Sequence, residues 1–277
     1  MTFSVPPHAD PVLTKDKRVL KNMLKREEEL HTIEYCSSVQ EDITPHMRKI
    51  VTDWMLEVCE DQQCQPEVFF LSVNYLDRFL STVNIKKNQF QLCASVCILL
   101  ASKFSQVVPI TTEKLVIYTD NSVTVEELRQ SEIKILNVLQ WELSSVTTHS
   151  FLEHFIPGLS LSSKVNIPKV RRHAETIAAL AATEYQFILA KQSVIAAAAL
   201  AAAVKDEVES QEVLLLMKKL AFRIGIDVSE IFLYLSYMTD IVDIVNFNPC
   251  STYISSCSVD PSFIYASSKR SASIFVK

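Results

Sequence analysis

The sequence contains only two glycines, Gly158 and Gly225, in 277 residues. Loops that hold phosphate groups need glycine where the backbone comes close to the ligand. Neither a P-loop nor a dinucleotide-binding fingerprint can be built from this chain. Nucleotide-binding enzymes are therefore a poor match.

The chain also lacks an excess of positive charge, because its formal net charge is −5 at pH 7. Broad binding to a nucleic acid backbone requires a strongly basic surface, so we expect no nucleic acid partner. The longest apolar run, 193–204, is mostly alanine, and it is shorter than the about 20 residues that span a bilayer. No apolar signal segment follows the polar start of the sequence, and we expect no membrane association.

The seven cysteines are odd in number and scattered, which is typical of a protein from a reducing compartment. Cys93 and Cys97 stand four residues apart and could share a metal ion. No histidine or second cysteine pair with zinc-site spacing lies nearby, which favours two buried structural thiols over a metal site. We expect neither a metal nor a cofactor.

Hydrophobic residues recur at helical spacing through most of the chain, while the alternating pattern of β-strands is scarce. We therefore expect an all-α fold. Thr44 followed by Pro45 is typical of a helix start, and Thr124 with Glu127 has the spacing of a capping box. The expected helices span residues 16–34, 45–61, 66–81, 87–104, 111–118, 124–140, 150–155, 168–189, 191–204, 210–224 and 228–245.

A short polar stretch, ELSSVTTHS at 142–150, separates two sets of helices of similar number and suits a domain junction. We predict an N-terminal segment with one helix at 1–40, a first helical domain at 41–143 and a second at 147–246. After that the sequence is rich in Ser, Tyr and Cys and has no period. We expect residues 247–277 to form a short disordered tail.

The helix expected at 45–61 carries an apolar stripe with an acidic border. Projection at about 100° per residue places Asp53 and Glu57 along one edge of this stripe. A core face with solvated carboxylates would explain the pattern, and so would a shallow groove that binds a peptide with one basic and one aliphatic side chain. The stripe consists of Ile43, Met47, Ile50, Trp54 and Val58.

The helix that ends in CILLASKF is apolar nearly all round from Leu92 to Ala101, so it should be the central helix of its bundle. Lys103 stands at its C-terminal end, where a cation favours the helix dipole by about 0.3 to 1 kcal/mol. Glu132 is a second ion in a mostly apolar surrounding. Either residue alone fits a solvated charge. Together with the apolar stripe and its acidic border, the two residues indicate a binding surface.

Taken together, these strings resemble a cyclin box, and in particular the box of D-type cyclins. The wider strings MRKIVTDWMLEVCE, NYLDRFLS, LLASK and EKLVIYTDNS look like the D type. The resemblance extends from about residue 18 to 204, with weaker similarity to about 245. Five signature positions of the box occur in order: Arg48, Asp77, Leu92, Lys103 and Glu132.

The resemblance implies two five-helix bundles that act as a regulatory subunit and not as an enzyme. Such a subunit binds and activates a G1-class cyclin-dependent kinase and promotes the G1/S transition. In that family the residues matching Lys103 and Glu132 contact the kinase and help to hold its αC helix inward. We expect Phe104 to join this contact. The residues matching Arg48 and Asp77 form an internal ion pair.

The resemblance also implies a groove that receives Arg-x-Leu peptides of substrates and inhibitors. Retinoblastoma-family proteins are the expected substrates, and the nucleus and cytoplasm are the expected locations. The matching groove residues are Met47, Ile50, Trp54, Glu57, Phe90 and Gln91, with Phe90 in place of the usual leucine.

Two elements that D-type cyclins usually carry are missing from the sequence. Residues 1–40 contain no Leu-x-Cys-x-Glu element, and the stretch after Asn246 contains no Thr-Pro or Ser-Pro site. We therefore expect a retinoblastoma-type substrate to be engaged through the kinase and the groove near Met47. We also expect turnover without a proline-directed phosphorylation in the tail.

Two other classes of function, a transcription adaptor and an enzyme, fit the sequence less well than a kinase regulatory subunit. A cyclin-fold transcription adaptor, resembling transcription factor IIB and without kinase activation, would need a zinc ribbon and basic helix faces, and neither is visible. An all-helical enzyme would have few candidate bases and no recognisable nucleophile motif. Its only histidine candidates are His46, His149, His154 and His173.

Overall fold

The computed structural model describes residues 16–247 apart from 31, 160–164 and 206, together with Asp10 and Val12. The described part is all-helical, as predicted, and contains no strand. The α-helices are α2 (Lys17–Glu29), α3 (Pro45–Asp61), α4 (Pro66–Leu80), α5 (Phe90–Ser105), α6 (Thr112–Tyr118), α7 (Val125–Val138), α8 (Thr148–Phe155), α9 (Ile167–Thr183), α10 (Gln192–Lys205), α11 (Ser210–Ile224) and α12 (Val228–Phe247). Three 3₁₀ turns accompany them: η1 (Lys87–Gln89), η2 (Ile156–Gly158) and η3 (Tyr185–Phe187).

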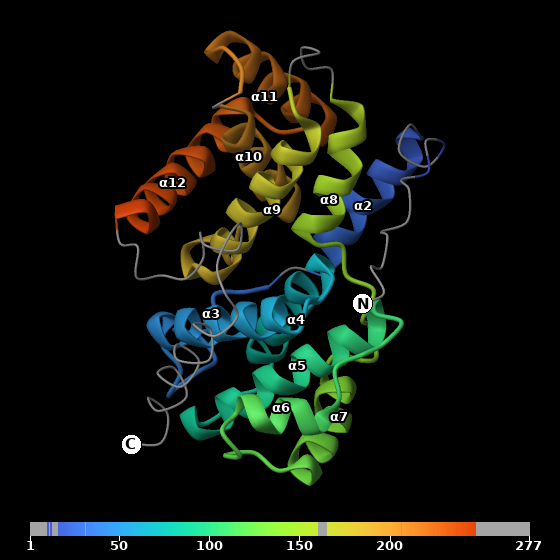
Figure 1. Cartoon of the computed structure of the whole chain (residues 1–277), viewed down its shortest axis with the longest axis vertical. Coiled ribbons are helices and arrows are strands. Elements are labelled where there is room, and N and C mark those ends of the chain that lie inside the picture. Colours follow the sequence, from blue (N-terminus) through green and yellow to red (C-terminus); the bar gives the residue numbers. More distant parts are fainter. Residues whose placement is uncertain are drawn as a thin grey trace.

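The helices form two bundles of five, which lie one above the other along the long axis of the molecule (Figure 1). The first bundle consists of α3 to α7 and the second of α8 to α12. Each bundle is arranged around one central helix. In the first it is α5, which contacts α3, α4, α6 and α7, and in the second it is α10, which contacts α8, α9, α11 and α12.

The two central helices are buried in different ways. From Cys93 to Ser102 every residue of α5 is buried, and Cys93 and Cys97 are among these buried residues, as predicted for structural thiols. The helix α10 is built largely of alanine, and only Gln192, Ala202 and Lys205 of its residues are not buried. Because alanine side chains are so short, the four neighbouring helices approach the backbone of α10 closely.

Threonine caps start several of the helices that position the site. The Thr44 hydroxyl accepts a hydrogen bond from the Met47 amide, and Pro45 takes the first helical position. At α7, Thr124 and Glu127 form the reciprocal capping box that their spacing predicts. These two helix starts are confirmed at the predicted residues.

The N-terminal helix α2 reaches the second bundle at the start of α10. Its Glu27 is buried and accepts hydrogen bonds of 2.7 Å and 2.8 Å from the amide and hydroxyl of Ser193 at the start of α10. A carboxylate at this position satisfies free amides and complements the helix dipole. The helix ends at Glu29, earlier than the predicted residue 34.

A second predicted helix, 168–189, is interrupted. The helix α9 ends at Thr183, Glu184 is extended, and the chain continues as the short turn η3. The carbonyl oxygens of Ala182 and Thr183 accept hydrogen bonds from Arg48 of the first bundle. The last two carbonyl groups of α9 are therefore held by a contact from the other bundle, which the local sequence pattern does not encode.

The other helix boundaries agree with the predicted ones to within a few residues. The predicted disordered tail at 247–277 lies outside the described residues, except for Phe247 at the end of α12. No helix within the described ranges combines the length and the apolar character needed to cross a membrane.

Candidate functional site

The most deeply buried ion pair of the described chain joins α3 to α4. The Arg48 side chain donates from Nε and Nη2 to the two carboxylate oxygens of Asp77, at 2.8 Å and 2.7 Å. The Tyr35 hydroxyl donates a third hydrogen bond to the same carboxylate at 2.8 Å. Because the Asp77 carboxylate faces the Arg48 guanidinium at such short distances, the pKa of Arg48 is raised despite its burial.

The same guanidinium also reaches the second bundle. It donates to the carbonyl oxygen of Thr183 at 3.0 Å and to that of Ala182 at 3.1 Å. Sequence reasoning missed Tyr35 and these two carbonyl groups as partners of Arg48. No local motif could have indicated them, because they come from distant parts of the chain.

A second ion pair lies at the surface of the first bundle. The Lys103 amine, at the end of α5, is 2.6 Å from the Glu132 carboxylate on α7. The Lys103 side chain is 46% exposed, while that of Glu132 is 15% exposed. The two residues that the cyclin resemblance assigns to kinase binding are thus brought together, and they bind each other in the isolated chain.

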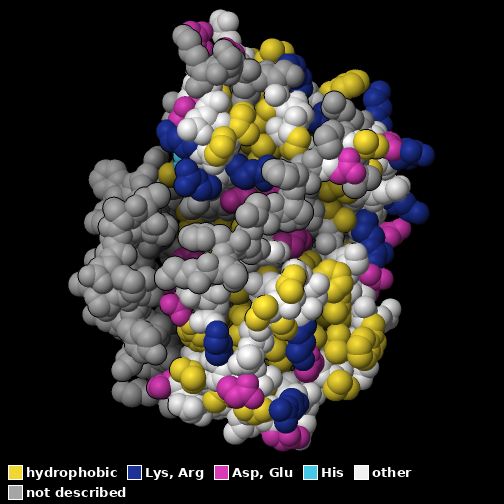
Figure 2. Space-filling model, turned by 45° about the vertical axis from the view of Figure 1, so that its right-hand side comes forward, with side chains coloured by type: hydrophobic (Ala, Val, Ile, Leu, Met, Phe, Trp, Pro, Cys, Tyr) yellow, Lys and Arg dark blue, Asp and Glu magenta, His cyan; other side chains and the backbone are white. Residues whose placement is uncertain are grey.

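Exposed apolar residues are close neighbours of Lys103 and Glu132 along the chain. They follow Lys103 at the end of α5 and in the loop before α6, and Ile133 follows Glu132 on α7. Figure 2 shows hydrophobic side chains spread over the lower part of the molecule, where the first bundle lies. The exposed fractions are 51% for Phe104, 99% for Val107, 82% for Val108 and 53% for Ile133.

Three of the residues assigned to the peptide groove, Trp54 on α3 and Phe90 and Gln91 on α5, are more deeply buried than peptide docking requires. Trp54 is 4% exposed, Gln91 is 8% exposed and Phe90 is fully buried. The Phe90 ring belongs to the core in this structure, and a direct contact of Phe90 with a peptide stays a prediction. Met47, Ile50 and Glu57 are half-buried and form the accessible part of the predicted groove.

Glu57 is the polar member of this surface. Its Oε2 atom is buried, and no donor from the described residues reaches it. Burial, together with the negative charges of Asp53 and Glu60, raises the pKa of Glu57 to about 7. A carboxylate in this state gains from a cation that comes from outside the chain.

One further polar cluster, which sequence reasoning did not find, lies between the bundles. Glu67 of α4 accepts hydrogen bonds from Thr147 at 3.0 Å and Ser150 at 3.4 Å, and His149 Nε2 lies 3.9 Å from its carboxylate. Burial raises the pKa of Glu67 to about 7, and burial also lowers the pKa of His149 to about 4. Burial therefore favours the neutral form of both groups.

Within the described ranges, one group has the composition of a metal site. The ligand atoms of His149, Glu153 and Glu175 lie within 4.8 Å of one another. Arg171, however, forms an ion pair with Glu153 and places a cation beside this group. The arrangement is a polar contact between α8 and α9, and the ligand set does not fit a dedicated metal centre.

Two family models match successive parts of the chain. The family model described as cyclin, N-terminal domain, matches residues 18–144, and the one described as cyclin, C-terminal domain, matches residues 146–252. A solved viral cyclin from herpesvirus saimiri has a similar fold. It superimposes with a TM-score of 0.73 at 26% sequence identity, covering 82% of this chain and 97% of that one.

Two curated relatives are G1/S-specific cyclin-D1 proteins. The one from Xenopus laevis is 49% identical over 199 residues, which are 72% of this chain and 68% of the relative. The one from Danio rerio is 53% identical over 191 residues, which are 68% of this chain and 65% of the relative. The matched region thus spans about two thirds of the length of these relatives.

Three findings agree. Two family models together cover most of the chain, two relatives are about half identical to it, and the fold is a tandem pair of five-helix bundles. This chain belongs to the cyclin family, the non-catalytic regulatory subunits of cyclin-dependent kinases.

Proposed function

We propose that the chain binds and activates a G1-class cyclin-dependent kinase and so promotes the G1/S transition. One observation carries the proposal, namely the ion pair of Lys103 and Glu132 beside exposed apolar residues on the first bundle. A charged pair within an apolar surface fits a contact that is desolvated when a partner binds. The relatives named G1/S-specific cyclin-D1 support the choice of kinase class.

In this proposal the first bundle, residues 41–143, presents the kinase-binding face. Lys103, Phe104 and Glu132 lie at its centre, with Phe104 as the exposed apolar anchor. Lys103 is accessible enough to exchange its partner for a kinase carboxylate, and Glu132 then becomes available to a kinase donor. The second bundle, residues 147–246, supports the first through the contacts of Arg48 with the end of α9.

Activation requires no chemistry from the cyclin. A kinase is active when its αC helix is turned inward, so that the αC glutamate reaches the lysine that holds ATP. A rigid surface that contacts αC only in this position stabilises the active state. The bundle supplies such rigidity, because α5 is buried along almost its whole length beneath the face.

The surface around Met47, Ile50 and Glu57 is the proposed docking groove for substrates and inhibitors with an Arg-x-Leu element. The unpaired oxygen of Glu57 suits an incoming guanidinium, and the half-buried side chains of Met47 and Ile50 suit the leucine. Trp54, Phe90 and Gln91 lie beneath as its support. Retinoblastoma-family proteins are the proposed substrates.

The proposed location is the nucleus and the cytoplasm, in keeping with cyclin-dependent kinase regulation. Fluorescence imaging of the full chain, with and without its kinase partner, tests this assignment. Exclusion from the nucleus in cycling cells would contradict it.

A reconstituted kinase assay tests the main proposal. The full chain is mixed with a purified G1-class kinase catalytic subunit, and complex formation and phosphorylation of a retinoblastoma-protein fragment are measured. We expect a stable complex of one copy of each chain and strong stimulation of the kinase. A chain that forms no complex, or a complex without activity, would refute it.

A further inference from the structure

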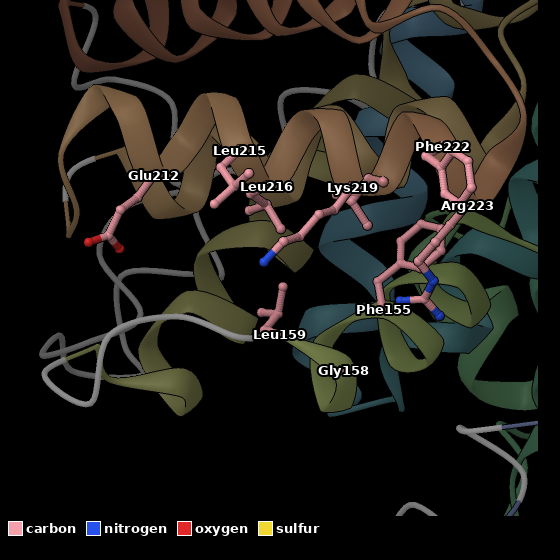
Figure 3. A pocket seen from close by; sticks show the side chains of 10 residues that line it. Phe155, Gly158, Leu159, Glu212, Leu215, Leu216, Lys219, Phe222 and Arg223 are labelled. Carbon is pink, nitrogen blue, oxygen red and sulfur yellow. The ribbon is translucent and has the colours of Figure 1, made fainter.

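The second bundle has an apolar groove of its own, distinct from the surface around Met47. It lies between α11 and the end of α8 with η2, and it encloses about 590 Å³. Figure 3 shows α11 along one side and Phe155, Gly158 and Leu159 along the other. Its side chains from α11 include Glu212, Leu215, Leu216, Lys219, Phe222 and Arg223.

The helix α11 carries two apolar stripes, although its folding needs only one. The inner stripe is buried in the bundle and includes Val213, Leu220 and Ile224. The second stripe consists of Leu215 and Phe222, which are 53% and 89% exposed. An exposed stripe of this kind on a surface helix is a sign of an interaction site.

Two cations accompany this second stripe. The Arg223 guanidinium lies 5.5 Å from the centre of the Phe155 ring and is half-buried, and burial lowers its pKa. The Lys219 amine points from α11 toward Leu159 (Figure 3). Among the residues that the structure describes, neither cation has an acidic partner, and the one acid of the groove, Glu212, lies at the far end of α11 (Figure 3).

The spacing of these groups indicates the shape of the occupant. Leu215 and Phe222 are seven residues apart, so they lie on one line about 10.5 Å apart along the helix. Lys219 lies between them. A partner helix with two apolar side chains seven residues apart matches this stripe, and acidic side chains between them match the cations.

We propose that this groove binds an acidic amphipathic helix of a partner protein, held by apolar contacts to Leu215 and Phe222 and by carboxylates that pair with Lys219 and Arg223. The charge of the groove selects this occupant over a basic or neutral helix. The site is a docking surface in addition to the kinase-binding face and the groove near Met47.

Two designed helical peptides test the proposal with the full chain. Both carry leucine at two positions seven residues apart, and one has glutamate at the intervening polar positions where the other has lysine. Binding of the fluorescently labelled peptides is followed by anisotropy. We expect the acidic peptide to bind at least tenfold more tightly than the basic one.

Two exposed substitutions locate the binding. Phe222→Ala and Lys219→Glu should each weaken binding of the acidic peptide at least fivefold, and neither side chain is part of the core. Phe232→Ala on α12 and Lys134→Glu on α7 are matched controls, because both residues are exposed and lie outside the groove. These controls should leave the affinity within twofold of the unmodified chain.

Four results of the peptide experiments would overturn the proposal, and a fifth comes from a deletion. The acidic peptide could fail to bind, or both peptides could bind equally. The groove variants and their controls could lose the same amount of peptide affinity. Finally, the chain could self-associate in a way that Phe222→Ala abolishes. Deletion of residues 248–277 is the remaining check. A fivefold gain in peptide affinity after this deletion would assign the groove to the chain's own C-terminal segment and would also overturn it.

Discussion

Arg48 of α3 binds Asp77 of α4 through two hydrogen bonds while the same guanidinium holds the last two carbonyl groups of α9. The pair therefore joins three helices and both bundles. Removing one partner leaves the other charge buried and uncompensated. This is the most costly outcome for a buried ion pair.

Asp77→Asn should lower the free energy of unfolding by about 3 to 5 kcal/mol, because Arg48 then remains charged without a counterion. The double variant Arg48→Met, Asp77→Leu should lose less than the two single variants together. Chemical denaturation measures both. Arg18→Gln, which breaks the exposed pair with Asp16, is the control and should change the stability far less than Asp77→Asn. Similar losses for Asp77→Asn and Arg18→Gln would contradict the role given to the buried pair.

Lys103→Glu should abolish activation of the kinase while circular dichroism still shows the helical content of the unmodified chain. The reason is that an acid then faces Glu132 and any acidic kinase group. The charge-swapped double variant Lys103→Glu, Glu132→Lys is the sharper test. It restores the internal pair but presents reversed charges, so it should fold normally and still fail to activate. Full activation by the swapped variant would show that the pair serves stability alone.

Binding of an Arg-x-Leu peptide should strengthen as the pH rises from 6 to 8. Glu57 has a pKa of about 7 in the free protein, so it is mostly neutral at pH 6 and mostly charged at pH 8. Only the charged form attracts the guanidinium. Calorimetric titration at several pH values measures the effect. Glu57→Gln should bind more weakly at pH 8 and should lose this pH dependence, and an unchanged pH profile would exclude Glu57 as the partner.

Trp54→Ala and Met47→Ala should have different effects, because only Trp54 belongs to the core. Loss of the buried tryptophan should cost about 3 to 5 kcal/mol of stability. Met47→Ala should leave the fold nearly unchanged and slow the phosphorylation of substrates with Arg-x-Leu, but not of substrates without it. Thermal melting and a comparison of the two substrates check this. Equal slowing of both substrates would contradict a docking role.

Glu67 and His149 should give opposite contributions to the pH dependence of stability. The pKa of Glu67 is raised from 4.5 to about 7, so its contribution to stability falls as the pH rises through this range. The pKa of His149 is lowered from 6.5 to about 4, so its contribution is lost as the pH falls through that range. The two effects offset each other between about pH 4.5 and 6.5.

A variant that removes one of the two groups should therefore show the pH dependence of stability that the other group causes. Relative to the unmodified chain, Glu67→Gln should gain stability as the pH rises from 5 to 6.5, and His149→Gln should lose it. The slope for one group is at most about 1.4 kcal/mol per pH unit. Urea denaturation at pH 5, 5.5, 6 and 6.5 measures these slopes. Curves that stay parallel to that of the unmodified chain would rule out this coupling.

The sequence predicted those features that depend on neighbouring residues along the chain. The caps at Thr44 and Thr124 are local hydrogen bonds, so the starts of α3 and α7 could be predicted to the residue. The apolar pattern of α5 likewise indicated a central helix. The resemblance of short strings to the cyclin box indicated the family, which the comparisons confirm.

Other features depend on contacts between distant residues, and the pattern could not indicate them. The carbonyl groups at the end of α9 accept hydrogen bonds from Arg48, more than a hundred residues earlier in the chain. The burial of Phe90 depends on how the helices pack around it, so the sequence pattern could not show which of the predicted groove residues remain accessible. The groove of α11 was missed because its two stripes appear as a single apolar pattern in the sequence.

The alanine-rich helix α10 has a consequence for how genetic variation in this chain should be interpreted. Substitutions of alanine by valine or leucine are usually regarded as mild, yet along α10 they would insert extra methyl groups between helices that already touch the backbone. Such overpacking typically costs about 1 to 3 kcal/mol, whereas most changes at exposed positions cost less than about 0.5 kcal/mol. In the second bundle, the alanines of α10 are therefore the residues at which a larger side chain is tolerated least.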